Sequence, residues 1–156
     1  MPFPRPVVDI RHPPEGLDAL VDWFELVSYN LVLLEGYSLE DVREAVARVA
    51  QAIETHGRSM ELSLGGPAAA SVEGGDLARI LNADHVWFRT SVEQLWWFFG
   101  VVEREDHGGH RQALGQFGRV LCESVRRHRT EEAEFARRLA EPRHLETIAR
   151  SPGNTN

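Results

Sequence analysis

The stretch EREDHGGHRQ, residues 103–112, decides how the second half of the chain folds. Apolar residues recur every three or four positions on both sides of it, a pattern typical of amphipathic helices. Each glycine costs about 1 kcal/mol relative to alanine inside a helix, so Gly108 and Gly109 predict a tight turn between two antiparallel helices. We interpret His107 as a C-terminal residue of the first of these helices, where the helix dipole favours a positive charge, and His110 as a first-turn residue of the second.

Four apolar stripes at helical spacing predict four main helices. They consist of Leu17, Leu20, Phe24, Val27, Leu31 and Leu34; of Val42, Ala45, Val46, Val49 and Ile53; of Phe88, Val92, Leu95, Phe99 and Val102; and of Leu114, Phe117, Leu121, Val125, Phe135 and Leu139. We expect these helices to end near Gly36, Gly57 and Pro142, and we expect Ser38 and Asp84 to cap the second and third helices. Mostly short connections make the predicted fold all-α, an up-and-down four-helix bundle.

Residues 57–75 interrupt the helical pattern with five glycines and a proline. This composition predicts a long Gly-rich loop between the second and third helices, with room for a short strand at 60–64. Residues 76–82 (DLARILN) and 143–150 (RHLETIAR) predict short extra helices.

The length of the chain, 156 residues, suits one hydrophobic core, so residues 1–150 are predicted to form a single helical-bundle domain and 151–156 a disordered C-terminal tail. The apolar run 95–102 is far shorter than the roughly 20 residues of a membrane span, and no membrane association is expected. Residues 1–16 carry prolines and charges where a secretory signal would be apolar, and Cys122 is the one cysteine of the sequence. Both features indicate a cytoplasmic protein.

All 17 basic residues are arginine, which excludes lysine-dependent chemistry such as Schiff-base formation. The net charge of −7 argues against nucleic-acid binding, because phosphate contacts need a basic surface. Residues 119–150 are nevertheless net positive, with eight arginines and six glutamates. Self-association or an Arg-lined anion site would fit this asymmetry, but a solvated helix face with Glu–Arg pairs is the favoured interpretation.

Histidines and one glutamate form a candidate metal site. His128 and Glu132 are one helical turn apart and in register with the apolar stripe of the fourth helix, where polar groups need partners. If the turn lies at 108–109, antiparallel helices pair residues whose numbers sum to about 217, which places Glu132 opposite His85. The end of the second helix brings His56 to the same end of the bundle. His56, His85, His128 and Glu132 are thus the best ligand set for zinc, iron or manganese. The alternatives are that His128 and Glu132 are solvated beyond the edge of the bundle, that the loop carries His56 elsewhere, or that the histidines are only hydrogen-bonded.

The segment EDHGGHR…HRTEEAEF, within residues 105–135, resembles hemerythrin-type bundles. Those bundles hold two irons with a histidine followed by H-x-x-x-E on the next helix, and His128 and Glu132 match that step. The match is confined to this short segment, and the chain is not assigned to that family. The first predicted helix lacks the histidine of that pattern, and the paired Glu-x-x-His motif of ferritin-like proteins is absent as well.

Aromatic side chains widen the apolar surface of the first and third helices beyond one stripe, and Trp and Phe are enriched at interface cores. The candidate interface residues are Trp23, Trp87, Trp96, Trp97 and Phe98. The leading hypothesis is therefore a non-enzymatic bundle that associates with itself or with a protein partner. The alternative is a metal-binding or small-ligand-binding bundle, with oxidoreductase chemistry as one use of its His/Glu site.

Overall fold

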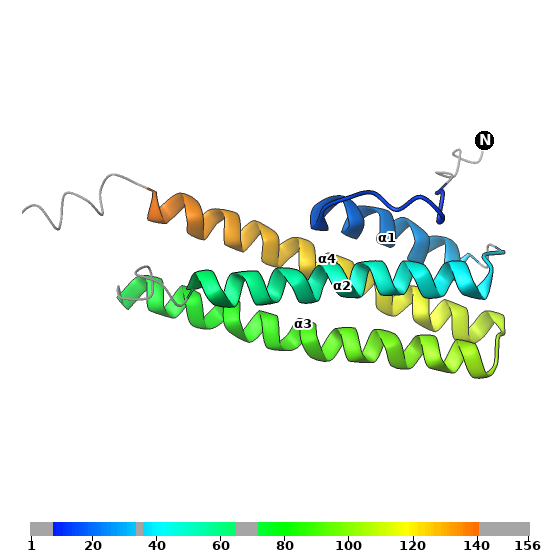
Figure 1. Cartoon of the computed structure of the whole chain (residues 1–156). Coiled ribbons are helices and arrows are strands. Elements are labelled where there is room, and N and C mark those ends of the chain that lie inside the picture. Colours follow the sequence, from blue (N-terminus) through cyan, green and yellow to red (C-terminus); the bar gives the residue numbers. More distant parts are fainter. Residues whose placement is uncertain (1–7, 34–35, 65–71, 141–156) are drawn as a thin grey trace, which may run out of the picture.

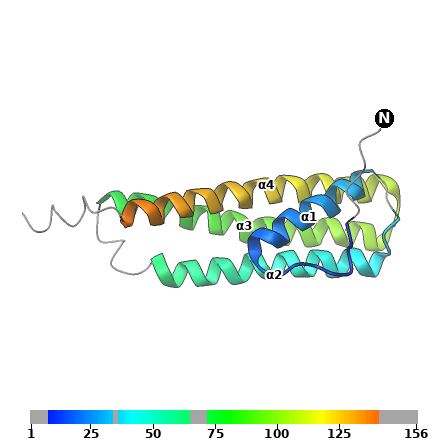
Figure 2. The same cartoon turned by 90° about the horizontal axis from the view of Figure 1, so that it is seen from above.

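The computed structural model describes residues 8–33, 36–64 and 72–140, and all regular structure within them is helical. The helices are α1 (Leu17–Val32), α2 (Leu39–Leu64), α3 (Val72–Arg104) and α4 (Gly108–Leu139). They pack lengthwise into a bundle in which α1 and α3 each contact both α2 and α4 (Figure 1). With 16 residues α1 is the shortest, and α2, α3 and α4 extend beyond it at one end of the bundle (Figure 2).

The predicted apolar stripes form the core of the bundle. The buried members are Leu20, Phe24, Val27 and Leu31 on α1; Val42, Ala45, Val46, Val49 and Ile53 on α2; Phe88, Val92, Leu95, Phe99 and Val102 on α3; and Leu114, Leu121, Val125 and Phe135 on α4. Burying side chains of this size contributes roughly 1.5–3 kcal/mol each before the entropic cost of folding is counted. The bundle is therefore held mainly by these stripes, as their periodicity predicts.

The turn between α3 and α4 lies slightly earlier than the sequence predicts. Gly108 and Gly109 form the first turn of α4, and His107 is its N-cap, with Nδ1 accepting the backbone N–H of Gly109 at 3.0 Å. The interpretation of His107 as a helix C-terminal residue is therefore wrong, whereas His110 does lie in the first turn of α4. Capping explains the shift, since the imidazole satisfies a backbone donor that the start of a helix leaves unpaired.

The predicted loop over 57–75 is wrong at both of its ends. α2 continues through Gly57 to Leu64, so the segment 60–64 is helical, and α3 already begins at Val72. One glycine costs a helix only about 1 kcal/mol, which the helix-forming residues around it offset. Residues 76–82 are consequently part of α3 and form no separate helix. Residues 65–71, the extra helix predicted at 143–150 and the tail 151–156 lie outside the described residues.

A close approach of α1 and α4 depends on glycine. A Cβ added to Gly115 would collide with the backbone oxygen of Ser28 and would lie 3.0 Å from the Leu31 side chain. A Cβ on Gly100 in α3 would meet nothing within 4 Å. The two positions therefore form a matched pair for testing how α1 packs on α4.

Gly115→Ala is expected to lower the free energy of unfolding by about 1–3 kcal/mol, because α1 must move away from α4. Gly100→Ala should raise it by about 0.5–1 kcal/mol, because alanine restricts the unfolded chain and adds no clash. Urea unfolding followed by circular dichroism measures both effects. Equal stability of the two variants would show that α1 does not lie on α4 as described.

No helix among residues 8–33, 36–64 and 72–140 combines the length and the apolar character that crossing a membrane requires.

Candidate metal centre

Three helices supply the four residues of the predicted ligand set. His56 comes from α2, His85 from α3, and His128 and Glu132 from consecutive turns of α4. The i,i+4 spacing on α4 directs two side chains at one point, and the antiparallel register with α3 brings His85 to the same place. The structure thus brings together all four residues that the sequence predicts.

The donor atoms converge on Glu132. Its Oε1 lies 2.7 Å from His56 Nε2 and 3.5 Å from His85 Nε2, and it also contacts His128 Nε2. The Nε2 atoms of His128 and His85 are 3.0 Å apart. Each residue offers one ligand atom, and these four atoms all lie within 4.8 Å of one another. The arrangement is compact enough for one ion to reach all four atoms.

The cluster lies inside the bundle. His85 is 4%, His128 1% and Glu132 6% exposed, and His56 is half-buried. The Phe88 ring packs edge-on against His128, with a centroid distance of 5.0 Å. Polar groups in such surroundings need compensating partners, which rules out the solvated alternative considered from the sequence.

Two further residues orient the cluster from outside. Asp84 Oδ2 lies 2.9 Å from His128 Nδ1 and accepts a hydrogen bond from Nδ1–H, which leaves Nε2 as the nitrogen that an ion would bind in exchange for its proton. Arg129 donates from Nη1 to Glu132 Oε2 at 2.9 Å and from Nε to Asp18 Oδ1 at 2.9 Å. Carboxylates behind a histidine ligand and hydrogen bonds to a carboxylate ligand are characteristic of protein metal sites.

The electrostatics of the cluster favour a cation at its centre. Burial alone would raise the pKa of Glu132, but hydrogen bonds from His128, His56 and His85 outweigh it and hold that pKa well below its usual range. Burial alone would lower the pKa of His128, and hydrogen bonds to Glu132 and Asp84 raise it instead. The cluster therefore combines a buried carboxylate anion with imidazole N–H donors, and a divalent ion can take the place of the donated hydrogens.

Sequence reasoning missed the supporting roles of Asp84 and Arg129. Asp84 is predicted to cap a helix, but it lies in the middle of α3 because that helix starts earlier. Arg129 lies in the segment 119–150 that is interpreted as a solvated helix face, although its spacing of three residues from Glu132 was a signal for the contact. Arg126 likewise pairs with Asp22 of α1, at 2.9 Å. The basic α4 thus binds acidic side chains of α1 in addition to forming pairs within itself.

Two other features with potentially reactive side chains, a second His/Glu group and a cysteine, are less suited to metal binding or catalysis. Glu105, His107 and His110 gather at the α3–α4 turn, but His107 Nδ1 already caps α4 and the group is largely exposed. Cys122 is 1% exposed, and burial raises the pKa of its thiol to about 12, so the reactive thiolate is not formed near neutral pH. Cys122 is thus a residue of the core.

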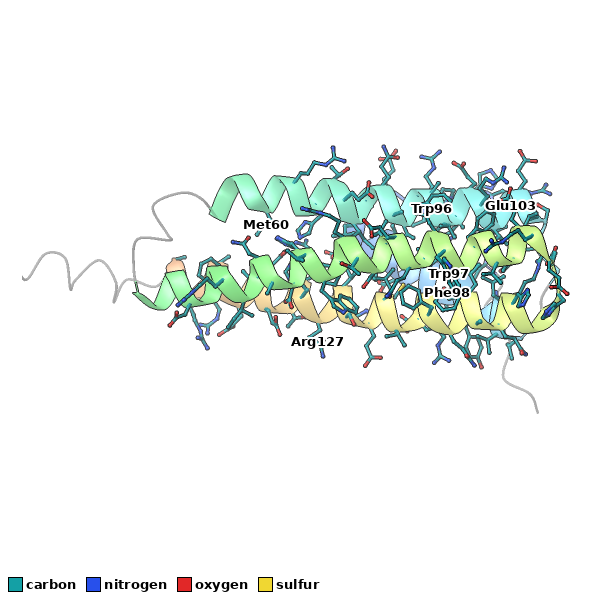
Figure 3. The ribbon with its side chains drawn as sticks, turned by 90° about the horizontal axis from the view of Figure 1, so that it is seen from below. Met60, Trp96, Trp97, Phe98, Glu103 and Arg127 are labelled. Carbon is teal, nitrogen blue, oxygen red and sulfur yellow. The ribbon has the colours of Figure 1, made fainter. Side chains whose placement is uncertain are left out.

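The candidate interface residues separate into two groups. Trp23 is 8% exposed and its Nε1 donates to the backbone oxygen of Asp9 at 3.1 Å, so it lies beneath the N-terminal segment. Phe98 is half-buried and stacks on Phe117. Trp87, Trp96 and Trp97 are exposed by 43%, 39% and 60%. Figure 3 shows Trp96, Trp97 and Phe98 together on α3, towards the end that carries Glu103.

No protein-family model, no curated protein and no solved structure matches the chain.

Proposed function

We propose that this protein is a metal-binding helical bundle that holds one transition-metal ion through His56, His85, His128 and Glu132. The observation that carries the proposal is the convergence of three imidazole Nε2 atoms and one carboxylate oxygen, from three helices, inside the bundle. A cluster that served stability alone would gain little from this composition, because apolar side chains of similar volume stabilise a core at least as well as buried ion pairs.

The ligand types narrow the choice of metal. Imidazole nitrogen with one carboxylate oxygen suits zinc, iron and manganese, whereas calcium and magnesium prefer oxygen alone. A tetrahedral zinc ion would use all four ligands and leave no open position, as in a structural site. Iron or manganese accepts additional ligands, and the open positions would then permit oxidoreductase chemistry.

Cobalt(II) titration of the metal-free protein tests the proposal. We expect d–d absorption to rise linearly and to stop at one equivalent, since one cluster binds one ion. Intense bands would indicate four-coordinate cobalt and weak bands a higher coordination number. Absorption that does not saturate, or no absorption above that of free cobalt, would contradict the proposal.

We propose that the helices follow one another in an up-and-down order. We also propose a cytoplasmic location for the protein. The links between α1 and α2 and between α3 and α4 are short, and α1 packs against α4 to close the ring. Short links between packed helices favour antiparallel neighbours. The single cysteine, which has no second cysteine for an internal disulfide, supports the proposed cytoplasmic location.

A second candidate function is self-association through α3. Trp87 and Trp97 are 43% and 60% exposed, and Val86, next to Trp87 in the chain, is 59% exposed. Large aromatic side chains at the centre of an interface contribute most of its binding energy. The occupant that we propose for this surface is a second copy of the chain, and the metal site does not depend on it.

Trp97→Ala is expected to weaken such a dimer about 30-fold, which corresponds to the roughly 2 kcal/mol lost at an interface hot spot. Light scattering on a size-exclusion peak over a range of concentrations measures the change. Val120→Ala on α4, where Val120 is 55% exposed, is the matched control and should leave the mass unchanged. A wild-type protein that is monomeric at all concentrations would eliminate this candidate.

A further inference from the structure

The two carboxylate oxygens of Glu132 have different partners. Oε1 faces the imidazoles, at 2.7 Å from His56 Nε2 and 3.5 Å from His85 Nε2. Oε2 instead accepts a hydrogen bond from Arg129 Nη1 at 2.9 Å. The Glu132 side chain is 5% exposed, so Arg129 satisfies an oxygen that water would satisfy at the surface. One oxygen of Glu132 is therefore left for an ion.

Asp18 of α1 holds the guanidinium that makes this contact. Arg129 donates from Nε to Asp18 Oδ1 at 2.9 Å and from Nη2 to Asp18 Oδ2 at 3.3 Å. Two parallel hydrogen bonds between a guanidinium and a carboxylate fix the orientation of the planar group as well as its position. Because arginine keeps its charge at physiological pH, the Nη1 donor that faces Glu132 is always present.

A metal ion that bound both oxygens of Glu132 would compete with Arg129. Such bidentate binding draws Oε2 towards the ion, so that the ion and the guanidinium would share one oxygen inside the bundle. Two cations repel each other more strongly in these surroundings than in water. Binding through Oε1 alone avoids this repulsion and keeps the hydrogen bond between Arg129 and Oε2.

The number of donor atoms then decides which metal fits best. Three Nε2 atoms and one carboxylate oxygen give four donors, and in the described part of the chain this group of mutually close ligand atoms includes no fifth residue. Zinc is stable with four tetrahedral ligands, whereas manganese prefers six and non-haem iron uses additional positions. A second oxygen from Glu132 would add a donor and reduce the preference for zinc.

We propose that Arg129, held by Asp18, is a positioning residue that restricts Glu132 to one coordinating oxygen and thereby selects zinc over manganese and iron. The inference rests on the proposed metal site and names the ion that this site prefers. It also assigns a function to the ion pair between α1 and α4, which reaches the buried cluster from an exposed carboxylate.

Cobalt spectra of the full chain test the coordination number. Arg129→Met removes the hydrogen-bond donors and keeps a long side chain. We expect intense d–d bands from four-coordinate cobalt in the wild type and severalfold weaker bands in Arg129→Met, where Oε2 is free to bind the ion. Arg126→Met is the matched control, since Arg126 has a similar exposure and binds Asp22 and Glu25 of α1 instead. Its bands should equal those of the wild type.

Metal preference is the second readout. Competition with a chelator gives the affinities for zinc and for manganese, and their ratio should fall about tenfold or more in Arg129→Met, a change typical when a partner of a metal ligand is removed. Arg126→Met should leave the ratio unchanged. Asp18→Asn should lower it by a smaller factor, because the donor remains but is less well oriented. This exposed substitution also provides the test if Arg129→Met does not fold.

The outcomes separate the positioning role from the proposed function. If Arg129→Met binds one equivalent of cobalt with the band intensity and the metal preference of the wild type, the positioning role is overturned and the metal site stands. Weak bands in the wild type itself would have the same meaning, since the ion would then have more than four ligands. A chain that binds none of these metals would overturn the proposed function, and the positioning role with it.

Discussion

The variant His128→Ala is expected to purify without bound metal, whereas the wild-type chain carries about one ion. His128 is the central ligand, since it contacts His85 and Glu132 directly and Asp84 fixes its orientation. Removing it takes away one of four ligands and also leaves Glu132 without its closest histidine. Metal content of the dialysed protein, determined by elemental analysis, measures the loss.

His110→Ala is the matched control, because it removes a histidine from the exposed group at the α3–α4 turn. It should retain a full equivalent of metal. Asp84→Asn provides a second variant in case His128→Ala does not fold, since the Asp84 side chain is 38% exposed and supports the site from outside. We expect its metal affinity to fall about 10- to 100-fold with its helix content unchanged. Metal loss in His110→Ala and retention in His128→Ala would place the ion at the turn.

Removal of the metal is expected to lower the melting temperature of the wild type substantially. An ion that binds only the folded state stabilises it by about 4 kcal/mol when its free concentration is about 1,000 times Kd. For a domain of this size that corresponds to a decrease of about 8–16 °C in Tm. Thermal unfolding before and after treatment with a chelator, and again after zinc is restored, measures the shift and its reversibility.

The variant His128→Ala is the control in this experiment as well, and the chelator should leave its Tm unchanged. A wild-type Tm that is indifferent to both chelator and zinc would mean that the four side chains form only a hydrogen-bonded cluster.

The sequence predicts the helical class and most core residues because each stripe repeats at 3.6-residue spacing. Its errors occur where local composition and packing oppose each other. Gly57 and the glycines near residue 74 resemble loop residues, yet α2 and α3 incorporate them. The role of His107 is predicted wrongly for a different reason. A histidine is favourable at the C-terminus of a helix and can also cap an N-terminus, and only the hydrogen bond from Gly109 shows that His107 caps α4.

The residues of the candidate site are predicted more completely from the sequence than the ends of the helices around it. Antiparallel pairing about one turn places His85 opposite Glu132, and that register survives a shift of the turn by one or two residues. The supporting contacts of Asp84 and Arg129 depend on side-chain direction across helices, which spacing along one helix does not give. For the same reason the sequence cannot tell buried Trp23 from exposed Trp97, as both widen an apolar stripe.

The most direct test of the central claim is the metal content of the wild-type chain, measured on the same size-exclusion peak whose mass light scattering determines. We predict about one zinc, iron or manganese ion per chain, either as purified or after reconstitution with the metal ion. A chain that folds with the expected helix content, contains no such ion and takes none up would contradict the account.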